Sequence, residues 1–368
     1  MESLKQKSIF TLGNGQLGLM LQKAAKRLQI PFESLSLQEA WDCLPELDAR
    51  SCLITFEQEH VDEALLEEIT KSKIPCFPSM ESFQQLRNKL IQKELLTQLQ
   101  IPTSPYLAVR SGADLDNFLK LHHGAILKAG QGGYDGKGVW RVDEQGQTRD
   151  GKLSILASQL RAPYLEKVIP FDFELASVVC RSANGEIVHY PSVKSLQRDG
   201  ICYQVEFTRE FAESKLAKKA AAISAKIAES LGYVGVLAVE LFAVGEELVV
   251  NEIAPRVHNS GHFTIDVCAG SQFENHLRAG LGMPLARTEA THPAAVMANL
   301  LWPAAEKDFA SLYAKLTCGP EWPSNMKLHW YGKSEIRPNR KMGHFTVYGD
   351  HIEECRSIAQ QVLASRWA

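Results

Sequence analysis

The stretch from Val239 to His262, VELFAVGEELVVNEIAPRVHNSGH, places two acidic residues inside apolar segments and ends in a polar loop. Glu240 lies between Val239 and Leu241, and Glu252 follows a run of apolar residues. Such neighbours favour buried β-strands. A buried carboxylate is costly unless it is paired or binds a metal, and Mg²⁺ typically takes one or two carboxylates together with substrate phosphates. The stretch therefore predicts a β-hairpin with a Mg²⁺ site at Glu240 and Glu252.

The loop of this hairpin decides whether the two carboxylates meet. A three-residue loop over 245–247 places Val244 opposite Leu248 and brings Glu240 and Glu252 to one face. A two-residue loop would put them on opposite faces, because side chains alternate along a strand. We expect the three-residue loop. An ordinary hairpin with solvent-facing acids is the alternative, and the dense polar cluster after the second strand argues against it.

The N-terminal segment has the pattern that opens a βαβ unit. Ser8 to Leu12 is typical of a buried strand, GNGQLG (13–18) of a tight turn, and the residues after it of an amphipathic helix. A dinucleotide site would need an acidic residue about 20 positions further on to hold the ribose, but residues 36–38 are Ser-Leu-Gln. The glycines instead allow another anion to approach a helix N-terminus. We therefore predict a Rossmann-like domain that does not bind NAD.

A further strand, SCLITFE, ends in Glu57. Open α/β sheets present ligand-binding groups at the carboxyl ends of their strands, so Glu57 is a candidate site residue. Taken by itself, a solvated turn acid is an equal alternative. Beyond this strand, ESFQQLRNKLIQKELLTQL (81–99) has a strong helical pattern.

Residues 125–142, AILKAGQGGYDGKGVWRV, form two strand-like runs around a loop with five glycines. Loops of this kind fold over nucleotide phosphates with backbone N–H groups, while a nearby lysine neutralises charge. Lys128 lies among apolar residues, where burial without a partner would be costly. The segment predicts a phosphate-binding lid, with a flexible surface hairpin as the alternative. Glu166, in the later run PYLEKV, lies where the edge of an adenine would be read.

From about Ala295 the pattern changes to short strands with Trp, Pro and Gly, which predicts a small third domain. This part carries RPNRKMGH, and four basic residues lie within nine positions there: Lys333, Arg337, Arg340 and Lys341. In a chain of net charge −3, such a cluster predicts a local anion site.

Composition limits the kind of protein that carries these motifs. A chain of 368 residues with 45% hydrophobic content can bury a large core in two or three domains. The slight acidic excess argues against a nucleic-acid partner, and the eight cysteines form no C-x-x-C pair, which favours reduced thiols. No apolar run reaches the roughly 18 residues of a membrane span. We expect a cytoplasmic protein with no nucleic-acid or membrane partner.

Four motifs, in this order, resemble those of the ATP-grasp family: GNGQLG, GGYDGKG, NEIAPRVHNSGH and RPNRKMGH. The resemblance spans nearly the whole chain and is to members that carboxylate an aminoimidazole ribonucleotide. It implies an α/β (α+β) ATP-grasp fold with a Rossmann-like preATP-grasp domain at 1–102, an ATP-grasp domain at 103–294 whose lid spans about 103–168, and a small β-rich C-terminal domain at 295–368. It also implies a homodimer.

The resemblance further implies a role for each matching residue. It agrees with the hairpin in making Glu240 and Glu252 the Mg²⁺ ligands. The implied ATP-binding residues are Lys89, Lys128, Gly133, Tyr134, Asp135, Gly136, Glu166, Lys167, Glu174, Asn251 and Glu252. The implied ribonucleotide-binding residues are Gln16, Leu17, Glu57, Tyr134, Arg256, Lys333 and Arg340. The implied catalytic residues, which include those for bicarbonate and the acyl-phosphate, are Arg256, His258, Asn259 and Lys128.

The activity that the resemblance implies is an ATP-dependent ligation. Bicarbonate attacks the γ-phosphoryl group of MgATP to form carboxyphosphate, which carboxylates 5-aminoimidazole ribonucleotide to N5-carboxyaminoimidazole ribonucleotide in purine biosynthesis. The nearest alternative is a sister ligase that uses formate and glycinamide ribonucleotide, and the NSGH and RPNRKMGH motifs argue against it. An NAD-dependent oxidoreductase is disfavoured by the missing ribose acid. A non-catalytic nucleotide-binding module is disfavoured by the full set of lysines and metal carboxylates.

Overall fold

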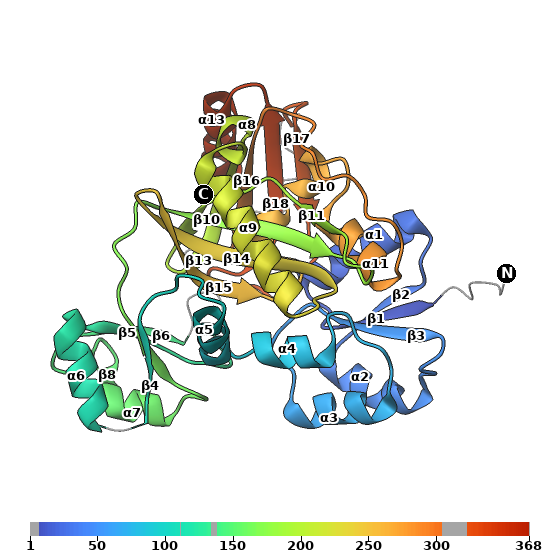
Figure 1. Cartoon of the computed structure of the whole chain (residues 1–368). Helices are drawn as coiled ribbons and strands as arrows, with labels where there is room; N and C mark the ends of the chain where they lie inside the picture. The colour runs from blue at the N-terminus through green and yellow to red at the C-terminus, as the bar shows by residue number, and fades with distance from the viewer. Residues whose placement is uncertain (1–6, 111, 134–137, 304–321, 368) are drawn as a thin grey trace.

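The computed structural model of the chain describes residues 7–110, 112–133, 138–303 and 322–367, and Figure 1 shows its arrangement. The described part contains a three-stranded parallel sheet, a nine-stranded antiparallel sheet, a four-stranded antiparallel sheet and a two-stranded ribbon, with helices packed against them. The mixed α/β class predicted from the sequence is confirmed. Within these residues, no helix has the length and apolar character needed to cross a membrane.

The N-terminal sheet has the order β2-β1-β3 (Phe32–Leu35, Ser8–Leu12, Cys52–Phe56) and is parallel, as a βαβ unit requires. Helix α1 (Gln16–Leu28) begins inside the GNGQLG segment rather than after Gly18, so the predicted turn is too long. The helix buries one face, because its apolar residues recur at helical spacing. Ser36 caps α2 (Leu37–Cys43) in a reciprocal capping box with Glu39. The position where a dinucleotide site would carry an acid is therefore used to start a helix. Helix α3 (Glu63–Ser72) completes this region.

The helical pattern over 81–99 forms two helices, α4 (Met80–Leu86) and α5 (Lys89–Gln98), rather than one. The break occurs because the Asn88 side chain accepts hydrogen bonds from the amides of Leu90 and Ile91 and so starts a new helix. The Arg87 side chain, which is buried, donates to the backbone oxygens of Glu59 and Val61. The new start places Lys89 in the first turn of α5.

The large sheet has the order β15-β14-β10-β12-β13-β16-β18-β17, with β11 beside β10. Its strands are Glu247–Ala254, Gly235–Val244, Phe173–Arg181, Val193–Arg198, Ile201–Thr208, Ala294–Leu301, Lys341–Gly349 and Met326–Trp330 in that order, with β11 at Ile187–His189. Strand β13 pairs with β16 over five positions, so the sheet runs without a break across the predicted boundary at 294/295.

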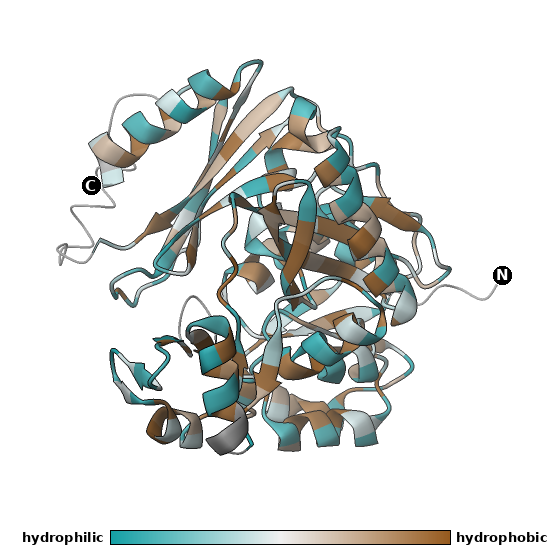
Figure 2. Ribbon diagram, turned by 60° about the vertical axis from the view of Figure 1, so that its left-hand side comes forward, coloured by the Kyte–Doolittle hydropathy of each residue, from teal (hydrophilic) through white to brown (hydrophobic). Residues whose placement is uncertain are grey.

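Both faces of the large sheet are covered, which explains why β14 is apolar at successive positions. Leu237 and Val239 pack with helix α9 (Lys215–Ser230), and Val236 and Ala238 pack with α11 (Gln272–Gly280) on the other face. Figure 1 shows α9 lying across β14, and α13 (Ile352–Val362) packs on β16 and β18. Figure 2 shows hydrophobic colour concentrated along the inner strands and hydrophilic colour on outward helix faces.

The four-stranded sheet, β4-β9-β5-β6, has its own core with α6 and α7 and lies at the lower left of Figure 1. Its elements are Tyr106–Ala108, Tyr164–Glu166, Ala125–Lys128, Val139–Val142, α6 at Gly112–His122 and α7 at Leu153–Ser158, with the ribbon β7 (Gln147–Thr148) and β8 (Gly151–Lys152). The remaining short segments are η1 (Leu44–Glu46), α8 (Arg209–Ala212), η2 (Asn259–Gly261), α10 (Thr264–Val267) and a last turn at Leu363–Trp367.

Candidate active site

The acidic hairpin of β14 and β15 places Glu240 opposite Glu252, although its loop differs from the predicted one. Val244 pairs with Glu247, so the loop holds two residues rather than three. A regular ladder from this loop would put the two carboxylates on opposite faces. A β-bulge inserts one extra residue, Asn251, and restores the shared face. The predicted loop is wrong, and the predicted pairing of the two acids is confirmed.

The two carboxylates differ in charge environment. Their side chains are 27% and 26% exposed, so each is largely buried. Burial and the neighbouring Glu252 raise the pKa of Glu240 to about 7. Burial also raises the pKa of Glu252, but the Lys89 ammonium, whose Nζ lies 2.8 Å from Glu252 Oε2, outweighs it and lowers that pKa. Two facing acids, one of which is hard to ionise, form an oxygen-rich pair of the kind a divalent cation stabilises.

Glu166 is buried on β9 between two lysines. Lys128 Nζ lies 2.5 Å from Glu166 Oε2 and 3.1 Å from Asn251 Oδ1, and Lys93 pairs with Glu166 Oε1. Burial raises the pKa of Glu166, but Lys128 and Lys93 outweigh it and lower the pKa to about 2. Burial lowers the pKa of Lys93 to about 8, against the attraction of Glu166. The hairpin bulge and β9 are thus linked through Lys128.

The polar loop after β15 turns toward the hairpin and the first domain. Arg256 Nη2 lies 2.9 Å from Glu59 Oε1, and Glu59 is buried. His258 Nε2 lies 3.4 Å from Glu240 Oε1, and its Nδ1 is 2.8 Å from Ser260 Oγ. Asn259 is buried and accepts a 2.7 Å hydrogen bond from Asn299 of β16. Of the predicted catalytic residues in this loop, Arg256 therefore contacts an acid of the first domain and His258 an acid of the hairpin, whereas Asn259 contacts β16.

Glu57 closes the glycine turn. Its carboxylate accepts hydrogen bonds from the backbone amides of Gly15, at 2.5 Å, and Gly18. A Cβ at Gly13, where φ is +114°, would lie 2.3 Å from the Glu57 side chain, so only glycine fits there. Burial raises the pKa of Glu57, while the two amides and the positive charge of Arg256 oppose the rise. The turn thus orients a carboxyl group that feels the positive charge of Arg256.

The predicted ribonucleotide residues come together only in part. Lys333 Nζ donates to Gln16 Oε1 at 2.7 Å, which joins the third region to the glycine turn across the chain. Leu17 is buried in a hydrophobic core that helix α1 shares with α11 and the large sheet. Arg340, by contrast, pairs with Glu335 in its own loop, through the Glu335 backbone oxygen at 2.8 Å and its carboxylate at 2.5 Å.

The remaining ATP-site predictions fall mostly on the lid. Gly133 is the last residue of the loop that the structure describes before 134–137, and Tyr134, Asp135 and Gly136 lie outside the described residues. The Lys167 amide donates to Pro105 O at 2.8 Å. Glu174, on β10, lines a narrow crevice together with Glu240 and Asn251. Burial raises the pKa of Glu174, and a hydrogen bond from Gln197 opposes the rise.

A second cluster of potential metal ligands contains Asp266, His329 and His344, whose ligand atoms lie within 4.8 Å of one another. His329 Nε2 is 2.8 Å from Asp266 Oδ2, and the two histidine rings stack with centroids 4.5 Å apart and planes 12° apart. A ring nitrogen binds a metal through a lone pair in the ring plane, so stacked rings do not converge on one ion. In this arrangement the cluster is a polar contact between α10 and strands β17 and β18.

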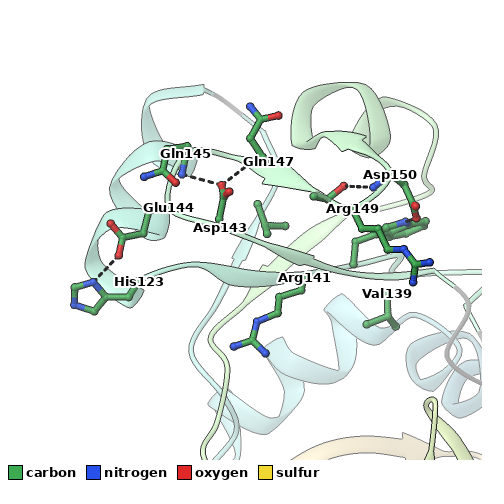
Figure 3. A pocket seen from close by; sticks show the side chains of 12 residues that line it. His123, Val139, Arg141, Asp143, Glu144, Gln145, Gln147, Arg149 and Asp150 are labelled. Carbon is green, nitrogen blue, oxygen red and sulfur yellow. Dashed lines mark hydrogen bonds and ion pairs between the residues drawn. The ribbon is translucent and has the colours of Figure 1, made fainter.

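An open pocket of about 880 Å³ lies on the β6 side of the four-stranded sheet and its ribbon (Figure 3). His123 Nδ1 lies 2.8 Å from Glu144 Oε1 at one edge, and Asp143 accepts hydrogen bonds from the amides of Gln145 and Gln147. These polar groups serve the local turns, and none of the predicted site residues in the described part of the chain lines this pocket. The candidate active site is therefore the acidic hairpin and its surroundings.

Two residues with central contacts, Lys93 and Glu59, were not predicted. Lys93 follows Lys89 by four positions on α5, so both lysines lie on one helix face. Glu59 follows Glu57 by two positions just beyond β3. These spacings could have signalled both, but their partners, Glu166 and Arg256, are far away in the sequence.

We expect NAD and NADP neither to bind this chain nor to raise its melting temperature. The reason is that Ser36 caps a helix and Glu57 occupies the glycine turn, so the turn holds a carboxylate in place of a pyrophosphate. Thermal shift and isothermal titration calorimetry with both dinucleotides, with ADP as the positive control, test this. Saturable NAD binding at micromolar concentration would contradict it.

Two family models match the chain. The ATP-grasp domain matches residues 94–273, and the phosphoribosylaminoimidazole carboxylase C-terminal domain matches residues 295–358. The chain is 36% identical over 376 residues to the N5-carboxyaminoimidazole ribonucleotide synthase of Synechococcus elongatus, covering 96% of this chain and 93% of that protein. It is also 36% identical to that of Haemophilus influenzae, covering 92% and 88%.

Solved structures agree over the whole chain. The carboxyaminoimidazole ribonucleotide synthase of Aspergillus clavatus complexed with ATP has a TM-score of 0.86 and 31% identity, covering 98% of each chain. The Aspergillus clavatus enzyme in complex with ADP and 5-aminoimidazole ribonucleotide has a TM-score of 0.83 and 29% identity, covering 98% of this chain and 99% of that one. The predicted ATP-grasp fold is confirmed.

Proposed function

Because the chain belongs to the N5-carboxyaminoimidazole ribonucleotide synthase family of ATP-grasp ligases, we propose that the residues around the acidic hairpin hold MgATP, bicarbonate and the ribonucleotide. The chain is an ADP-forming carbon–nitrogen ligase that carboxylates 5-aminoimidazole ribonucleotide to N5-carboxyaminoimidazole ribonucleotide in purine biosynthesis. The proposal concerns which residues perform each part of this reaction.

The proposed domains are 1–102, 103–294 and 295–368, with the lid at about 103–168. The first is supported by its separate parallel sheet, and the lid by the core of the four-stranded sheet. The third domain shares the large sheet with the second. The boundary at 294/295 therefore marks a change in the sequence and does not divide the structure into two separate bodies.

For ATP, the proposed phosphate ligands are Lys89 and Lys128, and Glu166 reads the adenine edge. Glu240 and Glu252 fit Mg²⁺, which when bound would neutralise phosphate charge. The proposed lid residues Gly133, Tyr134, Asp135 and Gly136 would cover the phosphates, and Lys167, Glu174 and Asn251 would complete the nucleotide site. Phosphoryl transfer depends mainly on positioning and charge neutralisation, so a site of lysines and carboxylates without a nucleophile suits it.

For the carboxyl group, Arg256, His258 and Asn259 are the proposed residues. An oxygen of bicarbonate forms a bond to the γ-phosphorus, and the bond from that phosphorus to ADP breaks. The ribonucleotide amine then attacks the carboxyl carbon of carboxyphosphate, and phosphate leaves. Arg256 would bind both bicarbonate and carboxyphosphate. Glu59 fixes one edge of the Arg256 guanidinium, and the Arg256 side chain remains 21% exposed, so its other edge can reach a ligand.

For the ribonucleotide, the proposed residues are Gln16, Leu17, Glu57, Lys333 and Arg340, with Tyr134 from the lid. The single observation that carries the proposal is the position of Arg256 between the acidic hairpin and the glycine turn. Arg256 pairs with Glu59, which lies near the proposed Mg²⁺ ligand Glu252, and the charge of Arg256 also acts on Glu57 in the glycine turn. A carboxyl donor held there would lie between the nucleotide and the ribonucleotide. Measuring ADP release with bicarbonate and aminoimidazole ribonucleotide each omitted in turn tests the assignment, and ADP release independent of both would contradict it.

We expect Lys333→Met and Arg340→Ala each to raise the ribonucleotide KM by about one to two decades, because a hydrogen bond to a charged group is worth roughly 1.5–3 kcal/mol and a decade about 1.4 kcal/mol. The ATP KM should change less than about twofold, since the nucleotide is proposed to lie at the hairpin. For Arg340 this requires its guanidinium to leave Glu335 for the phosphate. Steady-state kinetics with each substrate varied measures this.

Arg337→Ala, in the same loop, is the matched control and should leave both KM values unchanged. Equal weakening of ATP and ribonucleotide, or no effect of Arg340→Ala, would remove that residue from the phosphate site.

We further propose a homodimer that works in a reducing cytoplasm. Seven of the eight cysteines lie in the described part of the chain, and none of these seven forms a disulfide, which supports the compartment. Light scattering after gel filtration should give twice the chain mass of 40.9 kDa, and a monomer at micromolar concentration would contradict the dimer.

A further inference from the structure

Lys93 is a deeply buried charge beside the proposed nucleotide site. Its side chain is 1% exposed, and its ammonium pairs with Glu166 Oε1. It also donates to Thr103 Oγ1 at 2.7 Å, Ser104 Oγ at 3.2 Å and the backbone oxygen of Asn251 at 3.1 Å. Surrounded by oxygen atoms from β15, β9 and the segment before β4, this ammonium has no route to a ligand without breaking several hydrogen bonds.

Lys128 holds the other oxygen of Glu166 in a more open position. Its side chain is 15% exposed, against 4% for Glu166, and its second partner is the Asn251 side chain at 3.1 Å. Lys128 is the last residue of β5, directly before the glycine-rich loop. Of the two lysines that share Glu166, Lys128 is thus the one whose ammonium can turn toward an incoming phosphate.

This asymmetry matters because a buried carboxylate that loses its counter-ion is strongly destabilised. If Lys128 were the sole partner of Glu166, binding a phosphate would strip Glu166 of its charge compensation. We propose that Lys93 is the permanent counter-ion of Glu166 and that it frees Lys128 to exchange this carboxylate for the phosphates of a nucleoside triphosphate. Lys93 is then a positioning residue, and the inference rests on the proposed function, which assigns Lys128 to the ATP phosphates.

The proposal makes the effect of Lys93 depend on Glu166. In Lys93→Met the Glu166 carboxylate keeps the hydrogen bond from the Ser104 hydroxyl but only Lys128 as a counter-ion, so Lys128 is retained and ATP binding weakens. In Glu166→Gln there is no carboxylate to hold Lys128, so removing Lys93 as well should not weaken ATP binding further. Residues in one charge network show such non-additive effects, whereas independent sites add.

The test is a double-mutant cycle on the full-length protein, with ATP binding measured by calorimetry in the presence of Mg²⁺ and the KM values of ATP and ribonucleotide measured separately. Lys93→Met should weaken ATP binding by about 10- to 100-fold, the range expected for a charged hydrogen bond. In the Glu166→Gln background the same substitution should cost about threefold or less. The ribonucleotide KM should stay within about twofold in all variants.

Lys226→Met, which removes an exposed ammonium bonded to Leu99 O, is the control for loss of a lysine and should change neither KM. Should Lys93→Met fail to fold, the double variant Lys93→Met/Glu166→Gln should fold and bind ATP within about threefold of Glu166→Gln, since it leaves neither charge of the pair unpaired. A double variant that also fails to fold would overturn the proposal. An equal loss of ATP affinity in both backgrounds, or a parallel rise in both KM values, would overturn the proposal. Turnover of ATP by Glu252→Gln distinguishes failure of the proposed function from failure of the Lys93 proposal. If Glu252→Gln leaves ATP turnover intact, the proposed active site is wrong. If Glu252→Gln loses turnover but the effects of Lys93→Met and Glu166→Gln are additive, only the role of Lys93 is wrong.

Discussion

Glu252→Gln is expected to lower turnover by about two to three orders of magnitude, the range found when one preorganised hydrogen-bond donor is removed from an acyl-transfer site. Glu252 faces Glu240 across the hairpin and pairs with Lys89 at 2.8 Å. Glutamine keeps the shape of the side chain and removes its charge, so the proposed Mg²⁺ site loses one of its two carboxylates. The quantity to measure is ADP release at saturating Mg²⁺ and substrates.

The same hairpin provides the control. Glu246 is exposed in the two-residue loop, and Glu246→Gln removes an equal charge about one strand length away without touching the paired acids. It should retain full activity, and the melting temperature of both variants should stay close to that of the parent. Near-normal turnover in Glu252→Gln would remove the two-carboxylate site from the mechanism.

The second large effect is expected for Arg256. Arg256→Lys keeps the charge but loses the planar fork that binds carboxylates and phosphates with two parallel hydrogen bonds, and turnover should fall by about two orders of magnitude. Arg256→Met should in addition lower the stability, because removing one partner of a buried ion pair costs about 3–5 kcal/mol. Arg256 is the partner of the buried Glu59 at 2.9 Å.

The double variant Arg256→Met/Glu59→Gln separates these two effects. Without a charge on either side, the stability should return toward that of the parent, while turnover stays low because the anion ligand is still missing. Thermal unfolding and steady-state ADP release on the four proteins of the cycle measure both. Recovery of turnover together with stability would show that Arg256 has only a structural role.

The hairpin illustrates how far a sequence pattern leads. Apolar runs around two acids identified the two strands correctly, because burial of apolar side chains is a local property. The pattern failed at the loop, because a β-bulge leaves the composition of a strand unchanged while shifting its register. Counting alternation from Val244 assumed a regular ladder, and Asn251 breaks it. The loop error and the omission of the bulge cancelled each other.

Contacts between segments that are distant in the chain were harder to predict from the sequence. Ser8 to Leu12 forms a strand at the predicted residues, since a short apolar run before a glycine turn is a local signal. The buried role of Lys93 depends on Glu166, which is 73 positions further along the chain, so the spacing of Lys89 and Lys93 on one helix face does not by itself identify the partner. Arg340 was predicted from charge clustering, which does not report that Glu335 lies within reach.

The continuity of the large sheet across residues 294 and 295 bears on how the protein can be dissected. A fragment ending at residue 293 would lose β16, β17 and β18, leaving the backbone of β13 without the neighbour that it has over five positions. It would also lose Arg356, which binds Glu206 of β13 through both of its carboxylate oxygens. An uncovered strand edge is a template for pairing with another chain. Limited proteolysis or gene truncation at this junction should therefore yield aggregates rather than an independent nucleotide-binding module, and a useful fragment would have to retain the last three strands.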